Sequence, residues 1–169
     1  MKFATFTLAE AEGAILAHSL STPDGVLKKG RRLSADDVAA LARAGHACVI
    51  AARLEAGDVP EDAAAHRIAW RLAGAGVRVT EPFTGRANLH ATAAGLAVIP
   101  RDVIDRLNAI DEGLTVATLA PFERVASGEM VATVKVIPFA LPETVVAEAE
   151  RIAGAAPVSV AAFTPRSAG

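Results

Sequence analysis

The sequence of 169 residues has few cysteines, few aromatic residues and little surplus charge of either sign. Its single cysteine, Cys48, excludes an intramolecular disulfide and has no metal-ligating neighbour at a useful spacing. Because Cys48 lies in the apolar run 47–50, we expect a buried structural thiol. Aromatic residues make up 4% of the chain and the formal net charge is -2, which together argue against generic nucleic-acid binding. A small anionic ligand is still compatible with this charge, because one or two local cations suffice to bind it.

Long apolar segments are also missing. No run reaches the roughly 18 residues that cross a bilayer, and residues 1–6 lack the long apolar core of a signal peptide. We therefore expect a cytoplasmic protein with no membrane partner. Small aliphatic residues are abundant instead, mainly Ala and Val within an apolar fraction of 52%. Such a composition suits close packing of helices on a sheet.

Helix and strand signals alternate along the chain. Four helices are predicted after Ser34, Pro60, Pro100 and Pro142, where a capping residue or an N-terminal proline precedes an apolar stripe of helical spacing. Apolar runs between them predict short mixed strands. We therefore expect an α+β fold in two small lobes. The expected parts are residues 1–73, residues 77–163, and residues 164–169 as a linker toward a missing downstream module.

Two isolated features can be interpreted locally. His66 and Trp70 are four residues apart on the second predicted helix and should be neighbours, a pair that we interpret as covering the edge of the core. Lys135 is the only charge in the predicted strand 130–137. Either its side chain reaches water at a sheet edge, or it is held there for a counter-charge.

The segment 83–90, Phe-Thr-Gly-Arg-Ala-Asn-Leu-His, concentrates more hydrogen-bonding side chains than any other segment. A turn at Thr84-Gly85-Arg86 would present free backbone N–H groups beside a guanidinium, which is a grip for phosphate or carboxylate. Asn88 and His90 would point to the same side of an extended chain. The alternative is an ordinary turn into an edge strand, with the arginine in solvent or paired with Glu81.

Five segments together resemble a known family. They are Glu12–Ser19, Leu27–Ser34, Phe83–Leu89, Leu107-Asn108 and Val131–Phe139. In this order they are similar to the N-terminal part of bacterial molybdopterin-binding proteins, which act in molybdenum-cofactor biosynthesis and are in some cases fused to a nucleotidyltransferase domain. The most specific pieces are Thr-Gly-Arg-Ala-Asn and Val-Lys-Val-Ile-Pro-Phe.

The resemblance implies that this N-terminal domain contributes to binding molybdopterin, the molybdenum cofactor or a related anionic pterin. Arg86 and Lys135 would supply charge, and Thr84, Gly85, Asn88 and Asn108 would supply hydrogen bonds. The residues that would contact the ligand are Thr84, Gly85, Arg86, Asn88, His90, Asn108 and Lys135. No catalytic residue and no bound metal are expected, so the segment should not be an enzyme on its own.

One feature of the family is missing from the sequence. The Gly-rich loop of the molybdopterin-binding module, which follows this region in the family, does not occur. We therefore expect either a truncated chain or a stand-alone homologue, with the complete cofactor site absent. The alternative function is a non-catalytic structural or dimerisation domain that positions the downstream module. As a homodimer, it would bury the strands near 137–139 between subunits.

Overall fold

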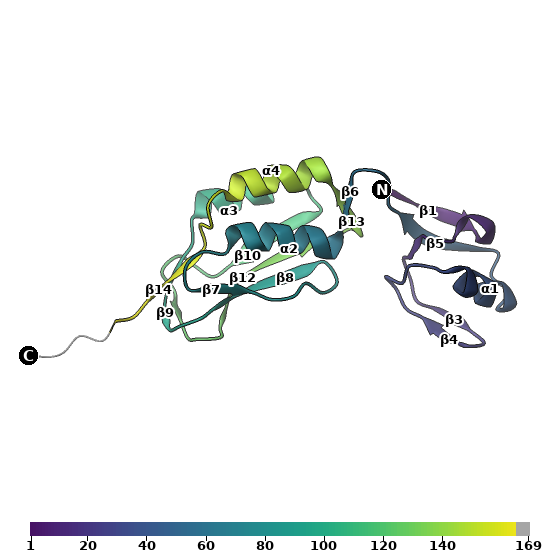
Figure 1. The fold of residues 1–169 in the computed structure, drawn as a ribbon, viewed down its shortest axis with the longest axis horizontal. Helices are drawn as coiled ribbons and strands as arrows, with labels where there is room; N and C mark the ends of the chain where they lie inside the picture. Colours follow the sequence, from purple (N-terminus) through teal and green to yellow (C-terminus); the bar gives the residue numbers. More distant parts are fainter. Residues whose placement is uncertain (165–169) are drawn as a thin grey trace, which may run out of the picture. The chain divides into compact units, whose positions relative to one another are not determined.

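The computed structural model describes residues 1–164 and divides into two units, Met1–Asp58 and a second unit that begins at Val59 (Figure 1). It contains four α-helices and many short strands, so the predicted α+β class is confirmed. The strand pairs of the larger sheets are antiparallel. Most of the expected linker, residues 165–169, lies outside the described residues.

The first unit consists of a small sheet, a hairpin and one helix. Its strands are β1 (Lys2–Thr7), β2 (Ile15–Leu16), β3 (Leu20–Thr22), β4 (Gly25–Leu27) and β5 (Cys48–Arg53), with a 3-10 turn at Leu8–Glu10 and helix α1 at Ala35–Arg43. β5 lies between β1 and β2, while β3 pairs with β4. Phe6, Leu16, Leu33, Leu41 and Val49 belong to its buried core.

Helix α1 begins as the sequence predicts. The Ser34 hydroxyl accepts a hydrogen bond from the Asp37 amide at 3.2 Å, and the Asp37 carboxylate accepts one from the Ser34 amide at 3.1 Å. The same carboxylate is 2.8 Å from the guanidinium Nε of Arg31. Chiefly because of Arg31, the pKa of the nearly buried Asp37 is lowered from its usual range.

The second unit holds three helices within its described residues, 59–164. They are α2 (Glu61–Leu72), α3 (Arg101–Asn108) and α4 (Glu143–Ala153). Its strands are β6 (Asp58–Pro60, which begins at the boundary), β7 (Val77–Val79), β8 (Arg86–Ala91), β9 (Gly95–Val98), β10 (Leu114–Thr118), β11 (Arg124–Val125), β12 (Met130–Val136), β13 (Ala140–Pro142) and β14 (Ser159–Ala162).

The division lies before α2, whereas the sequence places it after this helix. The reason is the apolar stripe of α2, whose residues Ala64, Ala65, Ile68, Ala69 and Leu72 are fully buried. This stripe belongs to the same core as strands β8 and β12. The first unit has a separate core, which contains no residue of α2.

The main sheet of the second unit has the strand order β10-β12-β8-β7. Helix α2 contacts β7, β8 and β12, and α3 contacts β10, while α4 packs on α2 and α3 (Figure 1). Arg67 of α2 joins the two longer helices, since its guanidinium is 2.7 Å from both Glu143 and Glu150 of α4. Chiefly because of Arg67, the pKa of Glu143 is lowered.

Two local expectations are wrong. Cys48 is exposed rather than buried, because β5 alternates and turns Val49 into the core instead. Trp70 neighbours His66 as expected, with 6.2 Å between the ring centroids. However, its side chain does not cover the edge of the core, because it is 67% exposed. None of the helices formed by residues 1–164 is long and apolar enough to span a membrane.

Candidate functional site: an open face of the main sheet

The main sheet carries its helices on one face and leaves the other without a helix from the described part of this unit (Figure 1). Strand β8 shows why the two faces differ. Ala87, Leu89 and Ala91 are buried on the helix side, while Arg86, Asn88 and His90 alternate with them. The expectation that Asn88 and His90 share one side is thus confirmed.

The strand register brings further polar side chains to this side. Lys135 lies directly opposite Arg86, and Thr133 lies opposite Asn88. On the other side of β8, Arg78 lies opposite His90. Residues directly opposite each other in an antiparallel pair project from the same face. We call these side chains the open sheet face: Arg78, Arg86, Asn88, His90, Thr133 and Lys135.

The cations of this face are not neutralised by carboxylates. Within residues 1–164, no ion pair involves Arg78, Arg86 or Lys135, so the pairing with Glu81 that was one alternative for Arg86 does not occur. The Lys135 ammonium donates a hydrogen bond to the Thr84 carbonyl oxygen instead. Lys135 is therefore held at the end of the face, pointing toward the turn that precedes β8.

The neutral polar side chains of the face are held by hydrogen bonds, either to one another or to nearby backbone. The Thr133 hydroxyl donates to the Asn88 side-chain oxygen at 2.7 Å. The Nδ1 atom of His90 lies 2.9 Å from the Gly128 carbonyl oxygen. Because a carbonyl oxygen only accepts hydrogen bonds, this nitrogen carries the hydrogen, and Nε2 is left to accept one from a ligand when the ring is neutral.

The turn before β8 has a structural function that the sequence did not reveal. Phe83 and Arg86 exchange backbone hydrogen bonds of 2.9 and 3.1 Å, and both residues between them have positive φ, 48° at Thr84 and 70° at Gly85. This is the conformation of a two-residue hairpin loop. The Gly85 amide donates to the Asp62 carboxylate at 2.6 Å. The amides of Gly85 and Arg86 are therefore occupied, contrary to the expectation of free N–H groups.

Asn108 does not join the open sheet face. Its side-chain amide donates to the Val116 carbonyl at 2.9 Å, and its side-chain oxygen accepts from the Val116 amide at 2.7 Å. Val116 belongs to β10, the outer strand of the sheet. The Asn108 carboxamide thus takes the place of a neighbouring strand. Of the predicted contact residues, Arg86, Asn88, His90 and Lys135 meet on the face, and Thr84 and Gly85 form the adjoining turn.

Comparison with known proteins identifies a match in the first unit. Residues 5–53 match a family model described as a domain of unknown function, DUF8806. No curated protein and no solved structure matches the chain. The match therefore assigns no activity, and it does not extend to the second unit, where the open sheet face lies.

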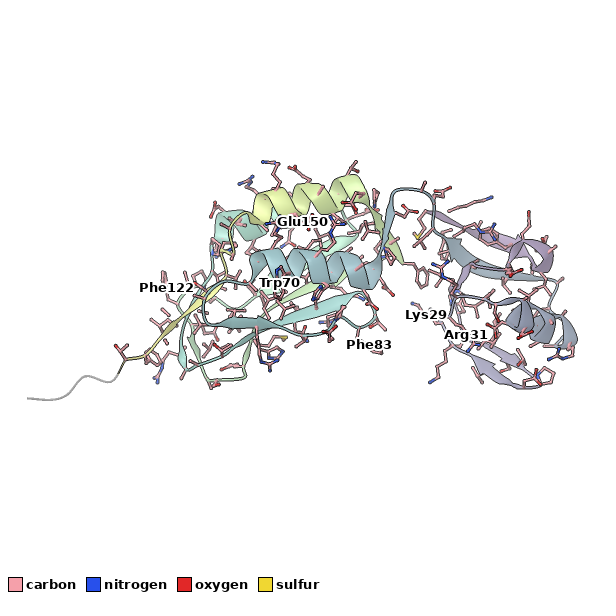
Figure 2. The ribbon with its side chains drawn as sticks, in the orientation of Figure 1. Lys29, Arg31, Trp70, Phe83, Phe122 and Glu150 are labelled. Atoms are coloured by element: carbon pink, nitrogen blue, oxygen red, sulfur yellow. The ribbon has the colours of Figure 1, made fainter. Side chains whose placement is uncertain are left out.

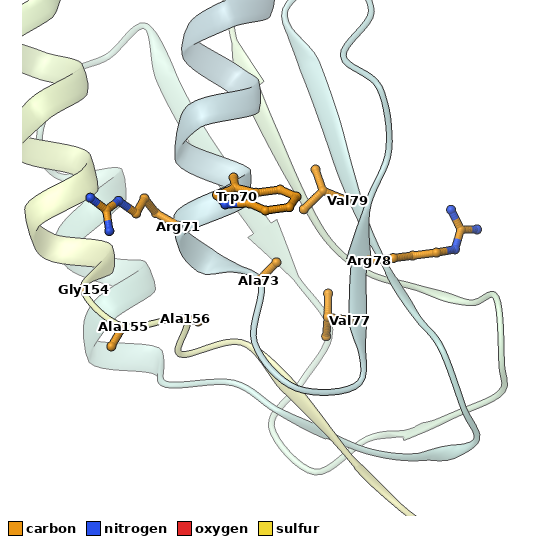
Figure 3. Close-up of a pocket in the computed structure, with 9 residues that line it drawn as sticks. All are labelled: Trp70, Arg71, Ala73, Val77, Arg78, Val79, Gly154, Ala155 and Ala156. Atoms are coloured by element: carbon orange, nitrogen blue, oxygen red, sulfur yellow. The ribbon is translucent and has the colours of Figure 1, made fainter.

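One further feature of the second unit was not predicted from the sequence. A cavity of about 520 Å³ lies beside the exposed Trp70, between the end of α2, strand β7 and the turn 154–156 (Figure 3). Figure 2 shows Trp70 on α2 and Phe83 on the loop before β8. The helical spacing of His66 and Trp70 predicted their contact, but no local pattern indicated that the indole stays uncovered. Residues 1–164 contain no cluster of three or more side chains suited to bind a metal ion.

Proposed function

We propose that the second unit binds a small anionic ligand on the open sheet face, as part of a molybdenum-cofactor biosynthesis protein whose ligand is molybdopterin or a related pterin. The observation that carries this proposal is the pair Arg86 and Lys135. They lie directly opposite each other on neighbouring strands, with no carboxylate partner in the described chain. Like charges in this position destabilise a sheet. A bound anion would remove that cost.

The neighbouring groups fit a ligand that offers hydrogen-bonding edges as well as charge. Asn88 and Thr133 form a hydrogen-bonded pair beside the two cations, and His90 follows on the same strand. The two segments most specific to the resemblance, 84–88 and 134–139, also lie side by side here, because β8 pairs with β12. This adjacency supports a shared role for the segments. The face holds cations and amides, which recognise a phosphorylated pterin without a nucleophile.

The proposal predicts saturable binding of molybdopterin in isothermal titration calorimetry of the whole chain. Arg86→Gln should weaken the affinity about tenfold, because one charge-assisted hydrogen bond is lost. Added salt should weaken binding as well, since the contacts are exposed. Arg101→Gln is the matched control, because Arg101 is an exposed arginine of α3 away from the face. Absence of saturable binding, or equal affinities of Arg86→Gln and the unmodified chain, would refute the proposal.

A structural role is the second candidate, favoured by two exposed apolar side chains. Phe83 is 78% exposed and Ile137 is 62% exposed. They flank one end of the sheet, because the Val136 amide donates to the Gly85 carbonyl at 2.7 Å. Apolar residues of this size are common in protein interfaces. This end of the sheet is therefore a candidate contact for a second copy or for a downstream module.

Sedimentation equilibrium measures this second candidate directly. If the chain forms a homodimer through Phe83 and Ile137, its apparent mass should rise with concentration, and Ile137→Ser should lower the association constant about tenfold because apolar burial is lost. Phe122→Ser is a suitable control, since Phe122 is 69% exposed and belongs to a different loop. A monomer at all concentrations would exclude the homodimer.

A further inference from the structure

The cavity beside Trp70 has a mainly apolar lining and shares only Arg78 with the open sheet face. It is bounded by Trp70, Arg71 and Ala73 of the α2 end, by strand β7, and by the turn 154–156. We call it the Trp70 cavity. Its volume of about 520 Å³ lies within the range of small-molecule sites. Strand β7 is an outer strand of the main sheet, so the cavity opens at the sheet edge.

The indole of Trp70 provides a flat apolar surface at this cavity. It is 67% exposed, while Ala73, Val77 and Val79 below it are partly buried and pack against the core. Figure 3 shows the indole ring beside Val79, above Ala73 and Val77. A tryptophan that stays exposed forgoes a large gain from apolar burial. A planar ring placed in the cavity would cover the indole and restore that gain.

The charged groups of the Trp70 cavity are all positive. Arg71 and Arg78 belong to its lining, and no Asp or Glu does. Within residues 1–164, neither arginine forms an ion pair. The nearby Glu150 is bound by Arg67, at 2.7 and 3.1 Å. In Figure 3 the Arg78 side chain extends away from the indole, which leaves Arg71 as the cation for this cavity.

The position of Arg71 has a partial explanation within the fold. It lies in the last turn of α2, where a cation interacts favourably with the helix dipole. That effect accounts for the charge of Arg71, but it does not account for the exposed indole beside it. The indole and the Arg71 guanidinium together match a ligand that combines an aromatic ring with an anion.

We propose that the Trp70 cavity binds a planar fused-ring heterocycle that carries a phosphate, with the chemistry of a purine nucleoside monophosphate. The ring stacks on Trp70 above the apolar floor, and the phosphate contacts Arg71. This inference does not depend on the proposed function, because it uses neither Arg86 nor Lys135. The two sites can be tested separately through Arg71 of the cavity and Arg86 of the sheet face.

The protein contains its own probe for this test. Trp70 is the only tryptophan and the chain has no tyrosine, so fluorescence excited at the red edge of indole absorption comes from Trp70 alone. Titration of the whole chain with adenosine 5′-monophosphate should quench this emission saturably and shift it to shorter wavelength. Adenosine and inorganic phosphate should each bind at least about tenfold more weakly, because each lacks one of the two contacts.

Two variants distinguish the cavity from the sheet face. Arg71→Gln should weaken the fluorescence-detected affinity about tenfold, through loss of a charge-assisted hydrogen bond. Its side chain is exposed, and far-UV circular dichroism should confirm an intact fold. Arg86→Gln should leave the affinity for adenosine 5′-monophosphate unchanged. The inference is overturned by a linear, non-saturable response, by an unchanged affinity in Arg71→Gln, or by inorganic phosphate binding as tightly as the nucleotide.

Discussion

Gly85→Ala is expected to lower the free energy of unfolding of the second unit by about 3 kcal/mol. Gly85 has a φ of 70°, where an L-residue with a β-carbon is strained. A Cβ atom at this position would also lie 2.4 Å from the Val136 carbonyl oxygen. That oxygen belongs to the backbone of the neighbouring strand β12. The steric overlap can therefore be removed only if the pairing of β8 and β12 shifts. Both costs occur together at this residue.

Gly128→Ala separates the two contributions. Gly128 also has a left-handed φ, 86°, but a Cβ atom built there meets no atom within 4 Å. This variant should lose only the conformational part, about 1 kcal/mol. Urea denaturation followed by far-UV circular dichroism and by Trp70 fluorescence gives both values. If both variants lost the same free energy of unfolding, the close approach to Val136 would make no contribution to the effect of Gly85→Ala.

Asn108→Ala is expected to cost about 2 kcal/mol, because two hydrogen bonds to the Val116 backbone are lost and no neighbouring strand replaces them. The affinity for anionic ligands should not change, since Asn108 lies away from the open sheet face. Urea denaturation measures the stability, and amide hydrogen exchange at Val116 should accelerate. This outcome would assign Asn108 a structural function, instead of the ligand contact that the resemblance implies.

Asn108→Asp provides a sharper comparison. One carboxylate oxygen can still accept the hydrogen bond from the Val116 amide. The other replaces the donor NH₂ group and faces the Val116 carbonyl oxygen, so two acceptors meet with no hydrogen between them. We therefore expect this variant to be destabilised despite its similar size. If Asn108→Asp and the unmodified chain were equally stable, the bond from the side-chain amide to Val116 would be dispensable.

The α+β class and the four helices were predictable because their signals are local. Ser34 and Asp37 cap a helix within four positions, and the buried stripe of α2 repeats at helical spacing. The alternation of Arg86, Asn88 and His90 likewise follows from a single strand. In these segments, neighbours in sequence decide the outcome.

The remaining features depend on contacts between distant segments. Nothing near Gly85 indicates that Asp62 occupies its amide, and the bond between Lys135 and Thr84 spans 51 positions. Cys48 was misassigned because β5 is apolar on both faces, so only its pairing decides which residues are buried. The predicted unit boundary is misplaced for a related reason. The apolar stripe of α2 predicts a buried helix, but it does not indicate which sheet the helix packs against.

The exposed thiol of Cys48 and the exposed indole of Trp70 lie in different units. Each is the only residue of its kind in the chain. An acceptor dye attached to Cys48 therefore forms a defined donor–acceptor pair with Trp70, without any substitution. Resonance energy transfer between them would measure the separation of the two units in solution, with and without a bound anion.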